Sequence, residues 1–168
     1  MFLIVIFENM GNYRKRTGKK LFNSKSTTID GVKMKSRLEA SMFKLLKDSG
    51  LEFYYEKETF VIVNSFRFMN DSYERKANNK GEMIDRGNKK IQPIKYTPDF
   101  IVDVDDVKYI IETKGFRTET FNMRYKLFKK YITDEGLNYK LYSPHTQKEC
   151  QEVMRLILED IKKNKPNE

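Results

Sequence analysis

The chain has 168 residues, of which 34% are charged and 39% are apolar. This length and balance predict one globular domain and exclude an intrinsically disordered chain. The formal net charge of +9 and the pI near 9.4 favour a polyanionic partner. A single cysteine, Cys150, excludes an intramolecular disulfide and predicts a reducing compartment or indifference to redox state.

Residues 1–7 are apolar, but they lack a basic leader, are followed at once by Glu8 and are too few to span a bilayer. We therefore expect no export, no membrane association and a cytoplasmic location. The run would suit an added edge strand, a subunit contact or an extension from an upstream start codon, with Met10 as the alternative start.

Positive charge is concentrated near the N-terminus. Between Gly11 and Lys47, eleven Lys or Arg residues occur with only two acids, an excess of nine that equals the net charge of the chain. A basic patch of this kind binds a nucleic-acid backbone in a salt-sensitive way. The ordinary interpretation is a solvated, mobile basic segment. This interpretation is compatible with nucleic-acid binding. We expect residues 1–25 to form a basic N-terminal segment.

Residues 27–35 predict an N-terminal β-hairpin, because the dipeptide Asp30-Gly31 separates two short runs with apolar residues. A helix is expected over residues 36–49, since its apolar residues recur at helical spacing and Gly50 follows. Residues 51–63 are rich in aromatic and β-branched side chains and predict one long strand or two short ones.

Residues 64–95 are polar and carry eight Lys or Arg residues and four acids. We expect a long basic loop inserted into the domain. Structureless loops of this length are uncommon in compact domains and are often functional. Two interpretations of this segment therefore remain: a flap that contacts DNA, and a loop that contains a short helix.

Two antiparallel strands are expected over residues 96–104 and 107–113, joined at Asp105-Asp106. A helix is expected from near Thr118 until before Gly136, because apolar residues line one of its faces and basic residues the other.

Residues 137–142 predict a short strand, and Thr146 with Glu149 forms a capping box for a last helix. The order of elements predicts an α/β domain over residues 26–163, with a mixed β-sheet flanked by helices. Residues 164–168 are expected to fray as a polar tail.

Asp99, Glu112 and Lys114 are the strongest candidates for chemistry. Side chains two positions apart on a strand share a face, so Glu112 and Lys114 point the same way while Thr113 faces away. Pro98 delivers Asp99 at a bend beside Glu112. Glu112 can bind a hard cation such as Mg²⁺, and Lys114 can hold charge beside a scissile phosphate or position the attacking water. Two acids so close repel unless a cation lies between them.

Each of these residues also has an ordinary interpretation. Asp99 would suit the cap of a turn, and Glu112 with Lys114 would suit the solvent face of a strand. The functional interpretation gains weight because the apolar neighbours of both motifs predict buried strands, where charged side chains are costly without a purpose.

Glu39 is the most ambiguous candidate. Ser36 and Glu39 match the capping box, so Glu39 could do no more than close the helix N-terminus. At about 100° per residue, however, Glu39 projects between Leu46 and Phe43, inside the apolar arc. Buried acids are rare without pairing or coordination. We therefore favour a metal site reached by this helix over a pure cap.

His145 is the only histidine and is expected in a loop at a helix entry, so a zinc site or histidine-based catalysis lacks the necessary ligands. No P-loop, Rossmann glycine pattern or Ser/Cys nucleophile constellation occurs. Nucleotide hydrolysis, a nucleotide cofactor and acyl transfer are therefore disfavoured.

Four stretches of the chain resemble the PD-(D/E)xK nuclease superfamily, and within it the endonuclease I type of Holliday-junction resolvase from T-odd bacteriophages. The likeness spans about residues 36–131, with a basic helix after the last motif. It is carried by Ser36-Arg37-Leu38-Glu39, Gly50-Leu51-Glu52-Phe53-Tyr54-Tyr55-Glu56, Tyr96-Thr97-Pro98-Asp99-Phe100 and Glu112-Thr113-Lys114-Gly115. The hairpin Ile29-Asp30-Gly31-Val32, with Ser36 and Glu39-Ala40, also resembles a group of small phage nucleases of the same superfamily.

The resemblance implies a restriction-endonuclease-like core and a DNA endonuclease that depends on Mg²⁺, with Mn²⁺ able to substitute. It implies catalytic roles for Glu39, Asp99, Glu112 and Lys114. Glu39, Asp99, Glu112 and the Thr113 carbonyl would ligate one or two metal ions, and Lys114 would assist the nucleophile. Water would attack phosphorus in line and leave a 5′-phosphate and a 3′-hydroxyl. An intertwined homodimer is implied by the likeness alone.

The basic residues expected to bind DNA lie in the N-terminal segment, near the start of the first helix, in the long loop and around the helix after the last motif. They are Arg14, Lys15, Arg16, Lys19, Lys20, Lys35, Arg37, Lys89, Lys90, Arg117 and Arg124.

The choice of DNA is less determined than the chemistry, because the loop 64–95 is much longer than its resolvase counterpart and residues 1–10 have no clear equivalent. We expect selectivity for branched DNA such as Holliday junctions, in the host cytoplasm if the protein is phage-encoded. A nuclease for plain duplex or single-stranded DNA, in restriction, repair or host-DNA degradation, is the enzymatic alternative. A catalytically inactive DNA-binding module of the same fold is the other.

Overall fold

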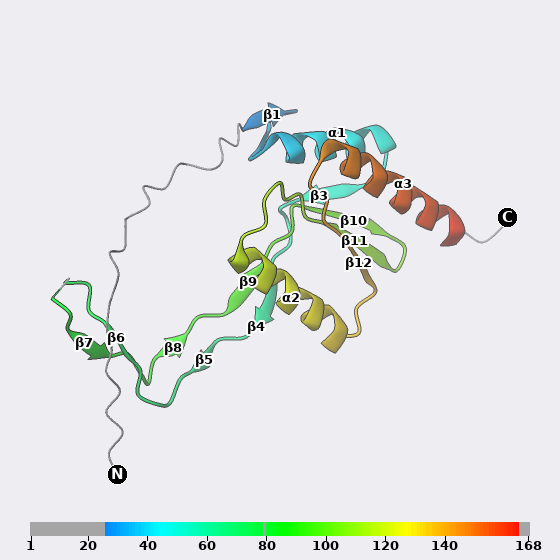
Figure 1. The fold of residues 1–168 in the computed structure, drawn as a ribbon. Coiled ribbons are helices and arrows are strands. Elements are labelled where there is room, and N and C mark those ends of the chain that lie inside the picture. Colours follow the sequence, from blue (N-terminus) through cyan, green and yellow to red (C-terminus); the bar gives the residue numbers. More distant parts are fainter. Residues whose placement is uncertain (1–25, 79, 165–168) are drawn as a thin grey trace, which may run out of the picture.

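The computed structural model describes residues 26–78 and 80–164. Within them the fold is mixed α/β, with three helices and several small sheets (Figure 1). The expected basic segment 1–25 and residues 165–168 of the expected tail lie outside the described residues. None of the described helices is long and apolar enough to cross a membrane.

A mixed four-stranded sheet forms the centre of the domain. Its strand order is β12-β11-β10-β3, and β10 is antiparallel to both β3 and β11, whereas β11 and β12 are parallel. The turn expected at Asp105-Asp106 joins β10 to β11, and Asp105 adopts a positive φ of 52° there. The strands are β3 Phe53–Tyr55, β10 Phe100–Val104, β11 Val107–Ile111 and β12 Tyr139–Tyr142.

Three helices pack on the two faces of this sheet: α1 Arg37–Ser49, α2 Glu119–Asp134 and α3 Gln147–Asn164. Residues of α1 and α3 share one buried cluster with Phe100 and Ile111, whereas residues of α2 share the other with Ile101 and Ile110. Successive strand residues point to opposite faces, so one strand pair supplies both clusters. The mixed sheet flanked by helices is therefore as expected.

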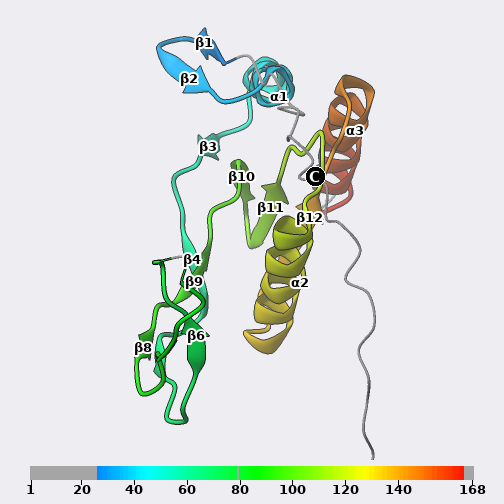
Figure 2. The same ribbon diagram turned by 60° about the vertical axis from the view of Figure 1, so that its left-hand side comes forward.

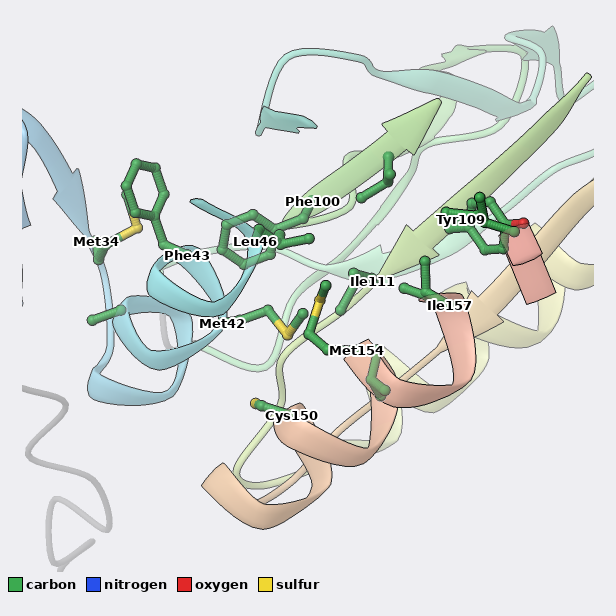
Figure 3. Packing of buried hydrophobic residues seen from close by; sticks show 14 residues of the cluster. Met34, Met42, Phe43, Leu46, Phe100, Tyr109, Ile111, Cys150, Met154 and Ile157 are labelled. Carbon is green, nitrogen blue, oxygen red and sulfur yellow. The ribbon is translucent and has the colours of Figure 1, made fainter. Parts of the chain in front are cut away.

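The larger cluster lies between α1, α3 and the sheet. Figure 3 shows Met42 of α1 and Met154 of α3 close together, with Ile111 of the strand pair beside them. Cys150 is a buried free thiol on α3, in agreement with its interpretation as a helix residue. Ile157, one turn beyond Met154, is fully buried in the same cluster.

Local sequence signals set the boundaries of the N-terminal elements. Strands β1 Thr27–Ile29 and β2 Val32–Met34 form the expected hairpin. Asp30 and Gly31 turn it with φ of 49° and 78°, as a two-residue turn with two positive φ angles requires. Ser36 caps α1, and Gly50 ends it in the left-handed conformation.

The later helices are capped as the sequence indicated. Thr118 caps α2 by accepting a hydrogen bond from the Phe121 N–H at 3.2 Å. At the start of α3, the Thr146 hydroxyl accepts from the Glu149 N–H at 3.2 Å. The Glu149 carboxylate accepts from the His145 N–H at 2.6 Å, one residue before the usual capping-box partner.

The segment expected to be a long loop is instead an extended β-arm, which we define as residues 64–93. The prediction of a loop, and with it of a hidden helix, was wrong for this segment. Its strands pair with one another, and their two or three residues are too few to show a strand period in the sequence. They are β5 Phe66–Arg67 with β8 Lys90–Ile91, and β6 Tyr73–Arg75 with β7 Met83–Asp85.

The β-arm is attached to the domain by two further strands, β4 Phe60–Val63 and β9 Ile94–Tyr96, which pair antiparallel. Residues 51–63 thus contain two short strands, β3 and β4. Tyr96 stacks on Phe128 of α2 with ring centroids 4.3 Å apart, and Phe60 lies 5.1 Å from the same ring. The base of the arm is therefore fixed against α2, while its outer strands extend away from the helices (Figures 1 and 2).

Neighbouring positions of α3 provide a test of the packing. Ile157→Ala should lower the free energy of unfolding by about 2–5 kcal/mol, because it leaves a cavity between α3 and the sheet. Leu156→Ala, at a side chain that is 39% exposed, should cost much less. Urea unfolding followed by circular dichroism measures both. Equal losses in the two variants would contradict the assignment of the buried face of α3.

Candidate active site

The segment Thr97-Pro98-Asp99 connects β9 of the arm to β10 of the central sheet. Pro98 is fully buried, and Asp99 bends the chain immediately before β10 begins at Phe100. The expected continuous strand over residues 96–104 is therefore divided here, with β9 and β10 in different sheets. The break is compatible with Pro98, which cannot donate a hydrogen bond to a strand ladder.

The second motif lies directly beyond the C-terminal end of β11. The Glu112 N–H donates to the Tyr142 carbonyl at 2.9 Å, and the Lys114 N–H donates to the Pro144 carbonyl at 3.1 Å. These bonds keep the segment extended, so Glu112 and Lys114 share a side. Lys114 Nζ lies 4.0 Å from Glu112 Oε1. The Glu112 residue is 6% exposed, whereas the Lys114 side chain is 39% exposed.

Asp99 and Thr113 join the two motifs. Asp99 Oδ2 accepts hydrogen bonds from the Thr113 backbone N–H at 2.7 Å and from the Thr113 hydroxyl at 2.6 Å. The Asp99 carbonyl accepts from the Glu56 N–H at 2.9 Å. The acid is therefore held at a fixed position beside the end of β11.

Glu39 of α1 is 7% exposed, so its predicted position on the buried face is confirmed. Its N–H donates to the Ser36 hydroxyl at 3.1 Å, as a capping residue does. Its Oε2 accepts from the Lys35 N–H and from the Tyr55 hydroxyl, each at 2.8 Å. Glu39 thus belongs to the helix cap and also presents a carboxylate to the interior.

One cleft of about 670 Å³ brings these side chains together. Glu39, Asp99, Glu112, Thr113 and Lys114 all line it, so every residue expected to be catalytic or to ligate a metal reaches the same space. A second cavity of about 540 Å³ shares several of these walls and extends along α2. Its cationic lining residues are Lys35, Lys95, Lys114 and Arg124.

The acids of the cleft have raised pKa values. Burial raises the pKa of Asp99 to about 6, with a further contribution from the charge of Glu39 and an opposing one from the Thr113 hydrogen bonds. Burial also raises the pKa of Glu112 to about 7, helped by the charge of Asp99 and opposed by the hydrogen bond from Tyr96. The site therefore accumulates negative charge that is costly in the absence of a bound cation.

The donor set has the chemistry of a site for a hard cation. Tyr55 and Lys35 use Glu39 Oε2, Thr113 uses Asp99 Oδ2, and Tyr96 uses Glu112 Oε2 at 3.0 Å. These bonds leave one oxygen of each carboxylate for another partner, and oxygen donors are those that Mg²⁺ prefers. Across residues 26–78 and 80–164, no three His, Cys, Asp or Glu side chains are gathered as a preformed metal site.

Three residues around the acids were not expected from the sequence: Tyr55, Tyr96 and Glu56. Tyr55 and Tyr96 donate to the acids, and Glu56 forms an ion pair with Lys35 across the lining of both cavities. The Glu56 hydrogen bond, with the charges of Glu39 and Asp99, raises the pKa of Lys35. The sequence offered one signal, since Tyr55-Glu56 lies in a stretch that carries the family resemblance.

The residues expected to bind DNA have different outcomes. Lys35 and Arg124 line the cavities, and Arg117 lies 5.9 Å from the Phe121 ring beside them. Arg37 is the exposed first residue of α1. The structure places Lys89 and Lys90 on the β-arm, away from the cleft lining. The remaining five lie outside the described residues: Arg14, Lys15, Arg16, Lys19 and Lys20.

A family model described as "Protein of unknown function (DUF1064)" matches residues 19–148. The chain belongs to this family. The matched range contains every residue that lines the main cleft, as well as the β-arm. No curated protein and no solved structure matches the chain. The family description assigns no activity.

The raised pKa of Glu112 has a measurable consequence. Between about pH 5 and 7 the unfolded protein has released this proton while the folded protein retains it, so the free energy of unfolding falls as pH rises through this window. Glu112→Gln removes the effect. In buffer with a metal chelator, the variant should exceed the wild type by about 1–3 kcal/mol at pH 8 and show no such gain at pH 4.

Denaturant unfolding at the two pH values measures this difference. Glu135→Gln, at an exposed acid that ends α2, is a suitable control and should change stability by less than about 0.5 kcal/mol at either pH. A Glu112→Gln variant that is less stable than the wild type at pH 8 would show that the carboxylate stabilises the metal-free fold.

Proposed function

We propose that this protein is a metal-dependent DNA endonuclease with a PD-(D/E)xK active site. One observation carries the proposal: Glu39 of α1, Asp99 before β10, and Glu112 with Lys114 after β11 line the same cleft. These residues lie far apart in the sequence, and the sequence motifs predict each of them at the site. A restriction-endonuclease-like core is part of the proposal, supported by the mixed sheet with helices on both faces.

The burial of the acids supports a role in chemistry. A carboxylate that is removed from water without a cationic partner is destabilising, and two such groups near each other are more so. Glu39 and Glu112 are both buried, and Lys114 lies 4.0 Å from Glu112 with its side chain 39% exposed. A purely structural role does not require this arrangement.

Mg²⁺ fits the donor set, with Mn²⁺ as a substitute. Glu39, Asp99 and Glu112 would hold it through their remaining carboxylate oxygens, and the Thr113 carbonyl would complete the protein's share of the ligands. When bound, Mg²⁺ supplies Lewis-acid stabilisation of the phosphate and an acidified water. Tyr55 and Tyr96 orient the carboxylates by donating to one oxygen of each.

Lys114 supplies the positive charge beside the reacting phosphate. Its ammonium lies 4.0 Å from Glu112 Oε1 and 5.4 Å from the centre of the Phe121 ring, so it is held at the wall of the cleft. From there it can neutralise charge on the phosphate or orient the water that attacks phosphorus. By resemblance, the products are a 5′-phosphate and a 3′-hydroxyl.

A polyanionic substrate suits the surroundings. Lys35, Lys95 and Arg124 line the cavity that continues from the acids along α2, and the chain has a net charge of +9. Branched DNA, such as a Holliday junction, is our preferred substrate, cut symmetrically by a homodimer in the host cytoplasm. A nuclease for linear duplex or single-stranded DNA is the alternative with the same site.

Cation binding can be tested without turnover. Mg²⁺ should raise the melting temperature of the wild type, because it binds only the folded state. The gain corresponds to about 2.7 kcal/mol at about 100 times the Kd. Asp99→Asn should gain much less, whereas Asp103→Asn, an exposed acid on β10, should behave as the wild type. Equal gains in all three proteins would exclude Asp99 as a ligand.

Cleavage of a synthetic four-way junction with Mg²⁺ tests the activity. Lys114→Ala should lower the rate by about 100-fold or more, because the charge beside the phosphate is lost, and should retain DNA binding. Lys126→Ala, on the exposed face of α2, removes the same charge and should remain active. The rates are read from labelled strands on denaturing gels.

Two outcomes would redirect the proposal. Equal cutting of a linear duplex and the junction would remove the branched-DNA preference and leave the nuclease. Inactivity with both Mg²⁺ and Mn²⁺ on every form of DNA, together with salt-sensitive binding, would favour a DNA-binding module that has lost catalysis.

A further inference from the structure

The β-arm exposes an unusual number of large apolar side chains. Among the described residues, six of the eleven exposed large hydrophobic side chains belong to it. Exposed large apolar side chains gathered on one element favour a site of interaction. The six are Phe66, Phe68, Met69, Tyr73, Met83 and Ile91.

The pairing of β5 with β8 determines which of these side chains lie on the same face of the arm. Phe66 lies opposite Ile91, and the next pair is Arg67 with Lys90. The register continues for one more position, because the Phe68 N–H donates to the Lys89 carbonyl at 3.0 Å. Directly opposite residues share a face, and alternate residues along a strand do so too. We call this face the aromatic face of the arm: Phe66, Phe68, Lys89 and Ile91.

The aromatic face combines two kinds of contact. The exposed fractions are 50% for Phe66 and 37% for Phe68, so both rings are accessible to a partner. The Lys89 ammonium is in no ion pair within 4.0 Å among the described residues, and the nearby charge that it affects is Asp85, whose pKa is lowered first by backbone hydrogen bonds and also by Lys89. Accessible aromatic rings on the same face as a lysine are typical of surfaces that stack bases and hold phosphates.

The charges of the arm favour the same partner. Glu82 pairs with Lys76 at 3.0 Å, and Glu74 pairs with Arg86 at 3.3 Å, so these acids are already compensated. Lys89 and Lys90, on the strand that returns toward the domain, are in no ion pair within 4.0 Å in the part of the chain that the structure describes. Residues 64–95 carry eight Lys or Arg residues and four acids. A second copy of the arm would bring like charges together, whereas a polyanion would not.

The strand of the arm that returns to the domain, from Lys89 through β8 to β9, leads to the cleft. Lys89 is followed by β8 and β9, and Lys95 of β9 lines the cavity that also contains Glu112 and Lys114. Six residues of extended chain cover at most about 20 Å. One strand of nucleic acid can therefore contact Lys89 and Lys95 while its backbone enters the cleft.

We propose that the aromatic face of the arm binds unpaired nucleotides of the DNA strand that is cut, with bases stacked on Phe66 and Phe68 and phosphate held by Lys89. The inference rests on the proposed nuclease function and deepens it, because it selects DNA with unpaired bases beside the cut. Accessible bases are a requirement, since rings stack on bases only where these are not already paired and stacked.

The test measures binding by fluorescence anisotropy in a metal chelator, with a labelled thymidine oligonucleotide and a blunt duplex. The double variants Phe66→Ala/Phe68→Ala and Phe66→Leu/Phe68→Leu should both lose about fivefold or more in affinity for the oligonucleotide. Their affinity for the duplex should be unchanged. The leucine variant keeps a large apolar side chain and removes the ring, so it separates stacking from the integrity of the arm.

Lys89→Ala should reduce the slope of log K against log salt by about 0.7 for the oligonucleotide, as expected for one lost phosphate contact. Lys162→Ala removes the same charge from the last turn of α3, at the opposite side of the molecule from the arm, and should leave the slope unchanged (Figure 1).

Several results would overturn the inference: wild-type affinity in both double variants, equal losses on duplex and oligonucleotide, or full affinity restored by leucine. A wild-type dimer that the alanine variant dissociates would assign the face to a second copy and overturn it as well. Cleavage is measured separately on the same proteins. Loss of oligonucleotide binding in proteins that never cleave DNA would refute the nuclease alone, and normal binding in cleaving variants would refute the inference alone.

Discussion

The antiparallel pairing of β10 with β11 is the constraint on which the rest of the structure depends. Its register, with Phe100 opposite Ile111, directs these two residues toward α1 and α3, while the adjacent Ile101 and Ile110 face α2. A slip of one residue would exchange the two faces and expose both helix contacts. Asp99 precedes β10 and Glu112 follows β11. The hydrogen bonds between these two antiparallel strands therefore bring the two acids to the same end of the sheet.

The acids of the cleft lower the stability of the fold at that end of the sheet. Glu39, Asp99 and Glu112 are held by hydrogen bonds from Tyr55, Thr113 and Tyr96, but their charges repel one another. These bonds position the carboxylates more than they neutralise them. Strained or like-charged groups at one place in an otherwise well-packed domain are typical of sites selected for chemistry rather than for stability.

The arm and the sheet divide two tasks in the proposed nuclease. The sheet and its helices form the rigid part, in which buried apolar packing fixes the acids. The arm is attached through Phe60 and Tyr96, whose rings pack on Phe128 of α2. Tyr96 also donates to Glu112, so one residue connects the base of the arm to the acids. Contacts made on the arm and the geometry of the cleft are therefore physically linked.

The sequence by itself determined the hairpin, the three helices with their caps, the central strand pair and the burial of Glu39, because these depend on neighbouring residues and on the periods of helix and strand. It also indicated which acids and lysine lie together, through the alternation of side chains after β11, the bend at Pro98 and the position of Glu39 in the apolar arc of its helix. Only the tertiary structure decided the rest. Short strands such as β5 and β8 carry no period of their own and pair through distant contacts, and the donors Tyr55 and Tyr96 reach the acids from other elements. Such contacts depend on how the chain returns on itself, which no local pattern records.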